Sequence, residues 1–77
     1  MRLFYFDIRD GASVSRDTTG TRLADLEAAR HEALSVLAPI AGDALPDDTP
    51  CSVTVTVRDE DRQPVFHASL ALVEDWI

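Results

Sequence analysis

The stretch that decides the fold runs from Asp17 to Leu34 and reads D-T-T-G-T-R-L-A-D-L-E-A-A-R-H-E-A-L. Its first four residues are a turn signal, because Gly20 can adopt a positive φ without a steric cost. Asp25 predicts a helix N-terminus, since its carboxylate can accept the unpaired N–H groups of the first turn. Apolar residues then recur at helical spacing at Leu26, Ala29, Ala33, Leu37 and Ile40. We therefore expect a helix that begins at Asp25 and lays one apolar stripe on a sheet.

Pro39 interrupts this helical pattern. Its nitrogen cannot donate to the carbonyl of Ser35, and its ring clashes with that carbonyl, at a cost of about 3 kcal/mol. We expect the helix to end near Ala38 and a short further turn to follow. A kinked helix that runs on to Gly42 is the alternative. Residues 43–50 contain two Pro and three Asp and are expected to form a linker loop.

Alternating apolar residues predict two strands before the helix. Leu3–Arg9 is aromatic and alternating, so it is expected to form the first strand. Asp10-Gly11 predicts a tight turn, and a short second strand is expected around Ala12–Arg16.

Two further strands are expected after the helix. Cys51–Arg58 alternates valine with polar residues, and Val65–Leu72 returns antiparallel after a polar hairpin at 59–64. The sequence thus predicts a single α+β domain over residues 1–77, of order β-β-α-β-β. It consists of an antiparallel sheet of about four strands with one helix packed on one face.

The same alternation assigns side chains to the two faces of the sheet. The face toward the helix is expected to hold Phe4, Phe6, Ile8, Val53, Val55, Val57, Phe66, Ala68, Leu70 and Leu72. The other face is expected to be polar and open and to hold Tyr5, Thr54, Thr56, His67 and Ser69. Trp76 is expected to pack over an end of the sheet.

Size and composition limit how this domain can be supported. A chain of 77 residues buries a small core, which is often helped by a disulfide, a metal or a second copy. The single cysteine excludes a disulfide within the chain, and Cys51, His31 and His67 do not form a zinc-ligand spacing. Self-association remains, so we expect a homodimer.

Charge and hydropathy narrow the partners. The net charge is −7, with 14 acidic residues against seven arginines, which argues against binding nucleic acid or an anionic membrane surface. No apolar run approaches the roughly 20 residues of a membrane span, and the first residues do not resemble a signal peptide. A single thiol without a targeting segment leads us to expect a cytoplasmic protein.

No group of residues predicts a catalytic, cofactor or metal site. Cys51, His67 and a nearby Asp could form a nucleophile and base, but no flanking motif supports this, and a structural thiol is the better interpretation. The acidic run Asp59, Glu60 and Asp61 could hold a hard cation, yet Arg62 and Pro64 break the pattern of a calcium loop, and a solvated hairpin tip is favoured. We therefore do not expect an enzyme.

Two groups of surface residues are candidates for binding a partner. Arg9, Asp10, Asp17 and Arg30 are expected to meet where the first hairpin approaches the helix, either as a charge network that fixes the turn or as a partner-binding patch. An aromatic floor of Tyr5, His67 and Trp76 could stack bases, but only Arg2 and Arg58 accompany it. His31 is expected to be a half-exposed helix residue.

These residues carry a resemblance to a family. The chain resembles small uncharacterised bacterial proteins, common in alphaproteobacteria, that contain a domain of unknown function. The shared features are an aromatic strand ending in R-D-G, then D-x-x-G, L-x-D and a helix that begins E-A-A-R-x-E-A. The matching positions are Phe6, Arg9, Asp10, Gly11, Asp17, Gly20, Leu23, Asp25, Glu27, Ala28, Ala29, Arg30, Glu32 and Ala33. Pro39 and the loop after it depart from the family pattern. The resemblance implies a fold and no mechanism.

The predicted function is a small cytoplasmic, non-enzymatic module for protein interaction or self-association through a sheet edge or the open sheet face. The chain also resembles, more weakly, the antitoxin half of HicAB-type toxin–antitoxin pairs. That resemblance implies an alternative, a regulator that binds a small basic partner such as an RNA-cleaving toxin.

Overall fold

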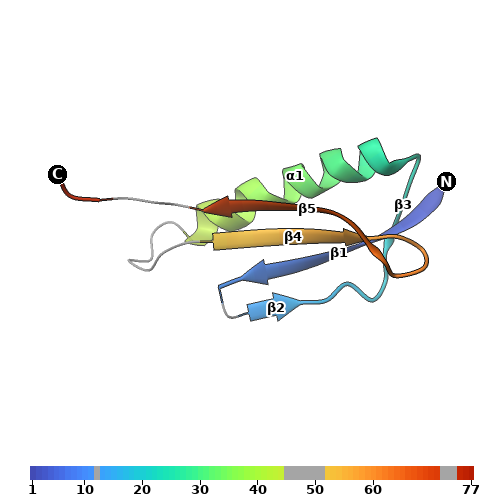
Figure 1. Ribbon diagram of the computed structural model, residues 1–77, viewed down its shortest axis with the longest axis horizontal. Helices are drawn as coiled ribbons and strands as arrows, with labels where there is room; N and C mark the ends of the chain where they lie inside the picture. Colours follow the sequence, from blue (N-terminus) through green and yellow to red (C-terminus); the bar gives the residue numbers. More distant parts are fainter. Residues whose placement is uncertain (12, 45–51, 72–74) are drawn as a thin grey trace.

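A computed structural model describes residues 1–11, 13–44, 52–71 and 75–77, with the backbone alone for 41–44. Five strands and one helix follow in the order β1 (Arg2–Asp10), β2 (Ser13–Ser15), β3 (Thr21–Leu23), α1 (Leu26–Ala44), β4 (Ser52–Arg58) and β5 (Pro64–Ala71). The strands form an antiparallel sheet in the order β2-β1-β4-β5, and α1 lies along one side of it (Figure 1). The expected α+β fold is confirmed.

A short fifth strand, β3, was not predicted. It pairs with residues 2–4 of β1, whereas β2 pairs with residues 8–10 of the same strand. The segment after the first turn therefore runs back along the whole outer edge of β1, with one interruption at residues 16–20. Three residues of β3 are too few to show an alternating pattern in the sequence.

The core lies between α1 and the middle of the sheet. The buried residues are Phe4, Ala29, Ala33, Leu37, Val53, Val55 and Val57. Small Ala29 and Ala33 leave room for the helix to approach the valines of β4 closely. The expected inward faces of β1 and β4 are thus confirmed. Because α1 packs on β4, β5 and β3, the β2 side of the sheet is not part of this core.

Asp25 caps the helix as predicted. Its Oδ1 accepts a hydrogen bond from the backbone N–H of Ala28 at 2.8 Å, and Glu27 adds a negative charge in the first turn. None of the described helices is long and apolar enough to cross a membrane.

The predicted end of the helix near Ala38 is wrong. The helix continues through Pro39 to Ala44. Leu37 and Ile40 pack on the core on either side of the proline, and their burial offsets the hydrogen bond that the carbonyl of Ser35 loses. Of the expected loop at 43–50, residues 43–44 belong to α1 and the rest lies outside the described residues, as does Cys51.

Three side-chain placements also differ from expectation. Tyr5, assigned to the open face, is only 8% exposed because arginine side chains cover its ring. Leu70 is 48% exposed because it stands on the outermost strand, and Trp76 is 99% exposed in a C-terminal tail that extends away from the sheet (Figure 1). Leu72 lies outside the described residues.

The continuous helix makes Pro39 a test of the cost of an internal proline. We expect Pro39→Ala to raise the free energy of unfolding by about 1–3 kcal/mol, because the side chain is exposed and alanine restores the bond to Ser35. Urea denaturation would measure this, with His31→Ala, an exposed change in the same helix, as a control expected to shift stability by less than about 0.5 kcal/mol. A loss of stability in Pro39→Ala would contradict the expected gain from the restored hydrogen bond.

Candidate functional site

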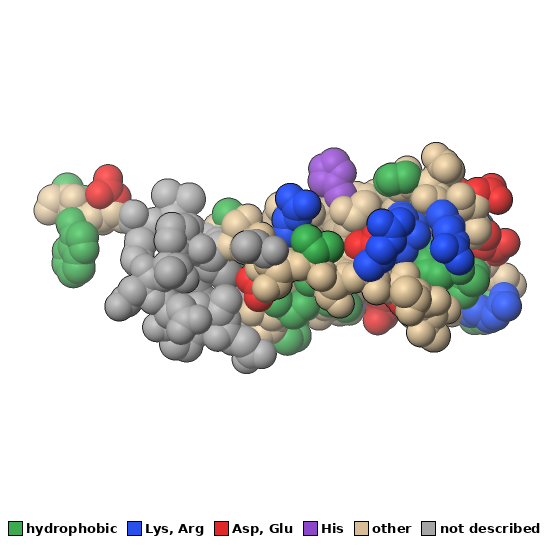
Figure 2. All heavy atoms as spheres, turned by 90° about the horizontal axis from the view of Figure 1, so that it is seen from below, with side chains coloured by type: hydrophobic (Ala, Val, Ile, Leu, Met, Phe, Trp, Pro, Cys, Tyr) green, Lys and Arg blue, Asp and Glu red, His purple; other side chains and the backbone are tan. Residues whose placement is uncertain are grey.

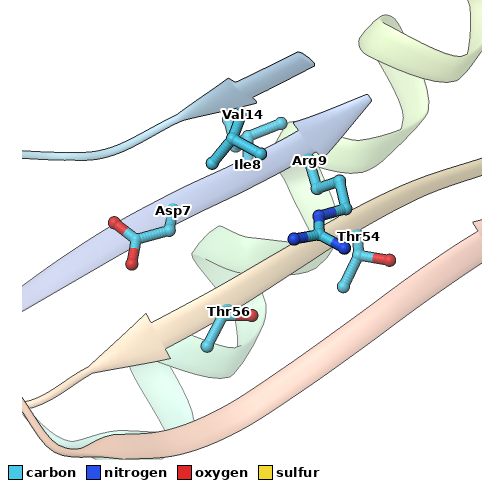
Figure 3. A pocket seen from close by; sticks show the side chains of 6 residues that line it. All are labelled: Asp7, Ile8, Arg9, Val14, Thr54 and Thr56. Carbon is cyan, nitrogen blue, oxygen red and sulfur yellow. The ribbon is translucent and has the colours of Figure 1, made fainter. Parts of the chain in front are cut away.

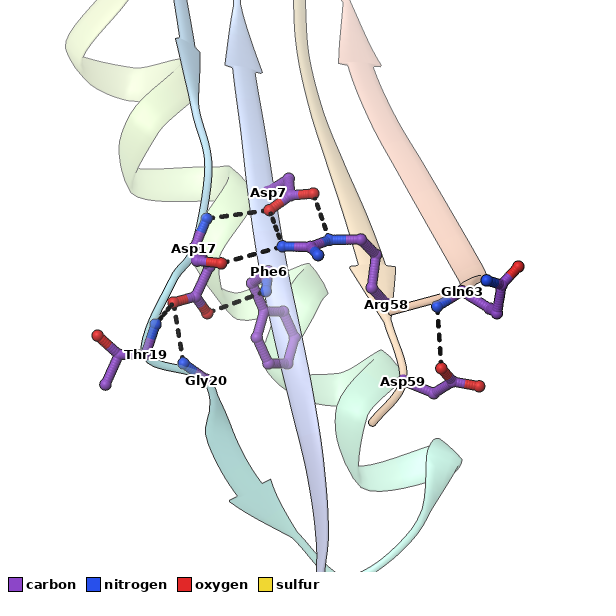
Figure 4. A network of polar contacts seen from close by, with 8 residues as sticks. All are labelled: Phe6, Asp7, Asp17, Thr19, Gly20, Arg58, Asp59 and Gln63. Carbon is purple, nitrogen blue, oxygen red and sulfur yellow. Dashed lines mark hydrogen bonds and ion pairs between the residues drawn. The ribbon is translucent and has the colours of Figure 1, made fainter. Parts of the chain in front are cut away.

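Three charged residues from three segments form a polar cluster on the side of the sheet that faces away from α1. Arg58, at the end of β4, donates from Nε to Asp7 Oδ2 at 2.7 Å and from Nη2 to Asp7 Oδ1 at 3.0 Å. The same Nη2 donates to the backbone carbonyl of Asp17 at 3.0 Å (Figure 4). Arg58 is only 5% exposed. We call Asp7, Asp17 and Arg58 the arginine cluster.

The carboxylate of Asp17 replaces a missing strand partner. Its Oδ2 accepts the backbone N–H of Phe6 in the middle of β1 at 3.0 Å, where the edge between β2 and β3 is interrupted. Its Oδ1 accepts the N–H groups of Thr19 and Gly20, both at 3.0 Å. Asp17 thereby holds its own loop against the sheet, and its N–H in turn donates to Asp7 Oδ1 at 3.0 Å.

Gly20 completes this loop because another residue would not fit. Its φ is +81°, and a Cβ added there would lie 2.9 Å from Leu3 Cδ1 and 3.2 Å from the carbonyl oxygen of Phe4. Both the backbone angle and the close approach require glycine. The D-x-x-G spacing thus has a physical cause: the Asp supplies the acceptor and the Gly supplies the turn.

Both carboxyl groups of the arginine cluster are held in their charged form. Burial alone would raise the pKa of Asp7, but its hydrogen bonds with Arg58 and the N–H of Asp17, together with the arginine charge, lower it below 3.8. Burial opposes ionisation of Asp17 as well, and the N–H groups of Gly20, Phe6 and Thr19 with the charge of Arg58 lower its pKa. The hydrogen bond to Asp7 raises the pKa of Arg58.

Two guanidinium groups lie on the ring of Tyr5. The Cζ atoms of Arg58 and Arg62 are 5.0 Å and 5.6 Å from its centroid, within the range of a cation–π contact. Arg62 holds a φ of +65°, a left-handed conformation that favours glycine. The β4–β5 hairpin therefore keeps an arginine where glycine would be less strained, and that arginine covers the tyrosine.

The acidic residues of this hairpin act as acceptors for backbone N–H groups. Asp59 Oδ1 accepts from Asp61 at 2.9 Å and from Gln63 at 3.0 Å. Glu60 Oε1 accepts from the N–H of Leu3 at 2.9 Å, which ties the hairpin to β1. These oxygens shape the turn, as the hairpin-tip interpretation requires.

The four residues expected to form a partner patch are not brought together. Arg9 and Asp10 lie at the end of β1, opposite Val14 and Ser13 of β2. Asp17 belongs to the arginine cluster. Arg30 lies on the exposed side of α1 and pairs with Glu27 at 3.2 Å. The helix turns Arg30 toward solvent, whereas the carboxylate of Asp17 faces β1.

The other sequence candidates are dispersed as well. His67 is exposed on β5 opposite Thr56, and His31 is exposed on α1. Tyr5 lies under two arginines and Trp76 lies in the extended tail, so these residues do not form a floor for bases.

A shallow hollow of about 340 Å³ lies on the sheet face opposite α1 (Figure 3). It is lined by Asp7, Ile8, Arg9, Val14, Thr54 and Thr56. The guanidinium of Arg9 extends toward β4 there, while the carboxylate of Asp7 is occupied by Arg58. The hollow thus offers one cation and two hydroxyls, without a nucleophile paired to a base among the residues that line it.

The two edges of the sheet differ in character. Seen from the β2 side, positive and negative side chains intermingle with small separate apolar areas (Figure 2). In contrast, β5 reads P-V-F-H-A-S-L-A and carries no Asp, Glu, Lys or Arg. Within the described sheet β5 has β4 as its one neighbour, and Val65 and Leu70 are 38% and 48% exposed. The sequence predicted an interaction through a sheet edge but did not identify which one, because strand order cannot be inferred from one strand's composition.

The arginine cluster predicts a pH dependence of stability. Both folded-state pKa values are below the ordinary 3.8, so the unfolded chain binds more protons and the unfolding free energy falls as pH drops below about 4. We expect Asp7→Asn to be less stable at neutral pH and to show a shallower acid slope, by up to about 1.4 kcal/mol per pH unit. Chemical denaturation from pH 2.5 to 7 would measure both effects. Thr18→Ala, which removes no carboxyl from the same loop, should keep the original slope, and equal slopes for Asp7→Asn and the unmodified chain would contradict the assignment.

The strained Arg62 predicts unequal consequences for two substitutions. Arg62→Ala should lower the free energy of unfolding by about 0.5–1 kcal/mol, because the contact with Tyr5 is lost while the backbone strain remains. Arg62→Gly should be about 1 kcal/mol more stable than Arg62→Ala, because glycine accepts the positive φ. Thermal denaturation of both variants would test this pair, and equal stability would rule out strain at this position.

One comparison with known proteins found a match. The family model of a domain of unknown function, DUF6894, matches residues 3–71. The match confirms the expectation that the chain contains a domain of unknown function. Neither the search of curated proteins nor the search of solved structures found a match. The match spans nearly all of the sheet and the helix described above, so this chain belongs to the DUF6894 family.

Proposed function

We propose that this chain is a small, non-enzymatic cytoplasmic module that binds a protein partner by adding a strand along β5. The observation that carries the proposal is the uncharged outer edge of β5, eight residues long. A sheet edge presents unpaired N–H and C=O groups, which another extended segment can pair with. Natural sheets usually protect such edges with lysine, proline, bulges or short strands.

The protections on β5 are confined to one end. Pro64 begins the strand, and a bulge lies beside it, because Val57 pairs with Phe66 while Arg58 pairs with Pro64. From Phe66 to Ala71 the strand is regular and uncharged. The opposite edge is different, since β2 and β3 have three residues each and the loop of Asp17 separates them.

The open sheet face supports an interaction role less well. Its middle is filled by the arginine cluster, whose hydrogen bonds are made within the chain. Thr54 and Ser69, farther along this face, also bond each other at 2.8 Å. Burying these already paired polar groups against a second face would gain little, so the edge is the better surface.

The same bonds support the non-enzymatic part of the proposal. The carboxylates of Asp7 and Asp17 serve Arg58 and backbone N–H groups, so they are structural acceptors. Their lowered pKa values make them weak bases.

A second candidate function, the antitoxin-like regulator, has one observation in its favour. Glu27 and Glu32 are exposed on α1, Asp25 is exposed just before it, and the chain has a net charge of −7. Such a surface would attract a small basic partner and speed its encounter. This partner would contact α1, whereas the first proposal uses β5.

The proposal predicts that a charge on β5 abolishes partner binding. Tagged Leu70→Lys should lose the proteins, or the second copy of the chain, that the unmodified chain captures from its own lysate, because lysine opposes strand addition. Val14→Lys, an equal change at an exposed position on β2, should capture them unchanged. Circular dichroism would confirm that both variants fold. If Leu70→Lys retains every partner while Glu27→Lys loses a small basic protein, the antitoxin-like alternative replaces the proposal.

A further inference from the structure

The regular part of β5 is self-complementary. Phe66 and Ala68 lie on the helix side of the sheet and pack partly against the core, and the strand alternation places Leu70 on that side too. His67 and Ser69 lie on the open side, opposite Thr56 and Thr54 of β4. Large apolar residues thus flank the small Ala68, and no charge lies among these five residues.

Symmetry restricts how two such edges can pair. Antiparallel pairing of identical edges requires a two-fold axis perpendicular to the sheet, which leaves both helices on the same side. In an antiparallel pair, residues directly opposite each other point to the same face of the sheet. The axis must therefore place one residue opposite its own copy in the other chain. An axis between two neighbouring residues would pair residues that point to different faces. The candidates near the middle of β5 are Ala68 and His67.

The side chains favour Ala68. On that axis, Phe66 of each copy lies opposite Leu70 of the other copy, which covers an exposed leucine with an aromatic ring. A His67 axis would instead place Pro64 opposite Leu70, where proline cannot donate a ladder hydrogen bond. It would also set two histidines against each other.

The helices would fit beside this axis. Because α1 packs across β4 and β5 and strands lie about 4.8 Å apart, the two helix axes would be roughly 10–14 Å apart. Directly packed helices lie about 8–10 Å apart, so exposed apolar side chains could occupy the space. Leu34 is an apolar side chain of α1 that is 40% exposed.

The geometry points to a second copy of this chain as the occupant of the β5 edge, paired antiparallel about a two-fold axis at Ala68 to give one continuous ten-stranded sheet. This inference rests on the proposed use of the β5 edge and adds the partner and the register. Charge favours the same surface, since the edge itself is neutral in a chain of net charge −7.

Disulfide trapping tests the register directly. In a Cys51→Ser background, Ala68→Cys should form a covalent dimer under mild oxidation, whereas His67→Cys alone should not, because residues that are not opposite lie too far apart to bridge. A mixture of His67→Cys and Ser69→Cys proteins should form the heterodimer, because these exposed positions face each other in this register. Along an antiparallel pair of strands, opposite residues alternate between a wider, hydrogen-bonded pair and a closer, non-hydrogen-bonded pair. One of the two expected bridges, Ala68→Cys with itself or His67→Cys with Ser69→Cys, therefore lies at the closer spacing. That bridge should form roughly tenfold faster than the His67→Cys homodimer.

The exposed pair keeps the test valid if Ala68→Cys, which is partly buried, does not fold. Bridging of His67→Cys to itself would overturn the Ala68 register, and equal bridging of every variant would indicate random collision and overturn it too. If the unmodified chain sediments as a monomer and no variant bridges, the second copy is not the occupant. In that case the capture experiment decides separately whether β5 takes another partner, so the proposed function can survive the failure of this inference.

Discussion

The guanidinium of Arg58, held between Asp7 and Asp17, is the constraint on which the sheet depends. It links the end of β4 to the middle of β1 and to the loop between β2 and β3. Removing a nearly buried arginine from water carries a large desolvation cost. That cost is met because the bonds to Asp7 and the backbone satisfy the charge and Tyr5 supports its other face.

The core under α1 and the segments outside it are stabilised by different interactions. Under α1, the valines of β4 and the alanines of the helix exclude water and form the small core. Outside this core, side-chain acceptors take the place of apolar burial: Asp17 bonds to Phe6 in the interrupted edge, and Glu60 of the β4–β5 hairpin bonds to Leu3. A chain of this length buries only a small core, so hydrogen bonds hold the segments that the core leaves out.

The sequence was sufficient for features set by local chemistry. The cap at Asp25, the valine alternation of β4 and the turn from Asp17 to Gly20 each follow from a few neighbouring residues, and the structure confirms them. It was insufficient where distant packing decides. Asp7 and Arg58 are 51 positions apart, and no spacing rule relates them. Pro39 was assigned its local cost, but the burial of the turns on either side outweighs it.

The two edges of the sheet also differ in how they are closed. The edge of β1 is closed by its own returning segment, and the carboxylate of Asp17 satisfies the N–H that this segment leaves unpaired. At β5 the protection ends with Pro64 and the bulge beside it, and the strand beyond Phe66 is regular and neutral. The chain has 21 charged residues, and a charge on this edge would oppose the addition of another strand. Every charged residue of the chain lies outside β5, so this strand is suited to pairing, because strand pairing gains most where neither side chain must be desolvated as an ion.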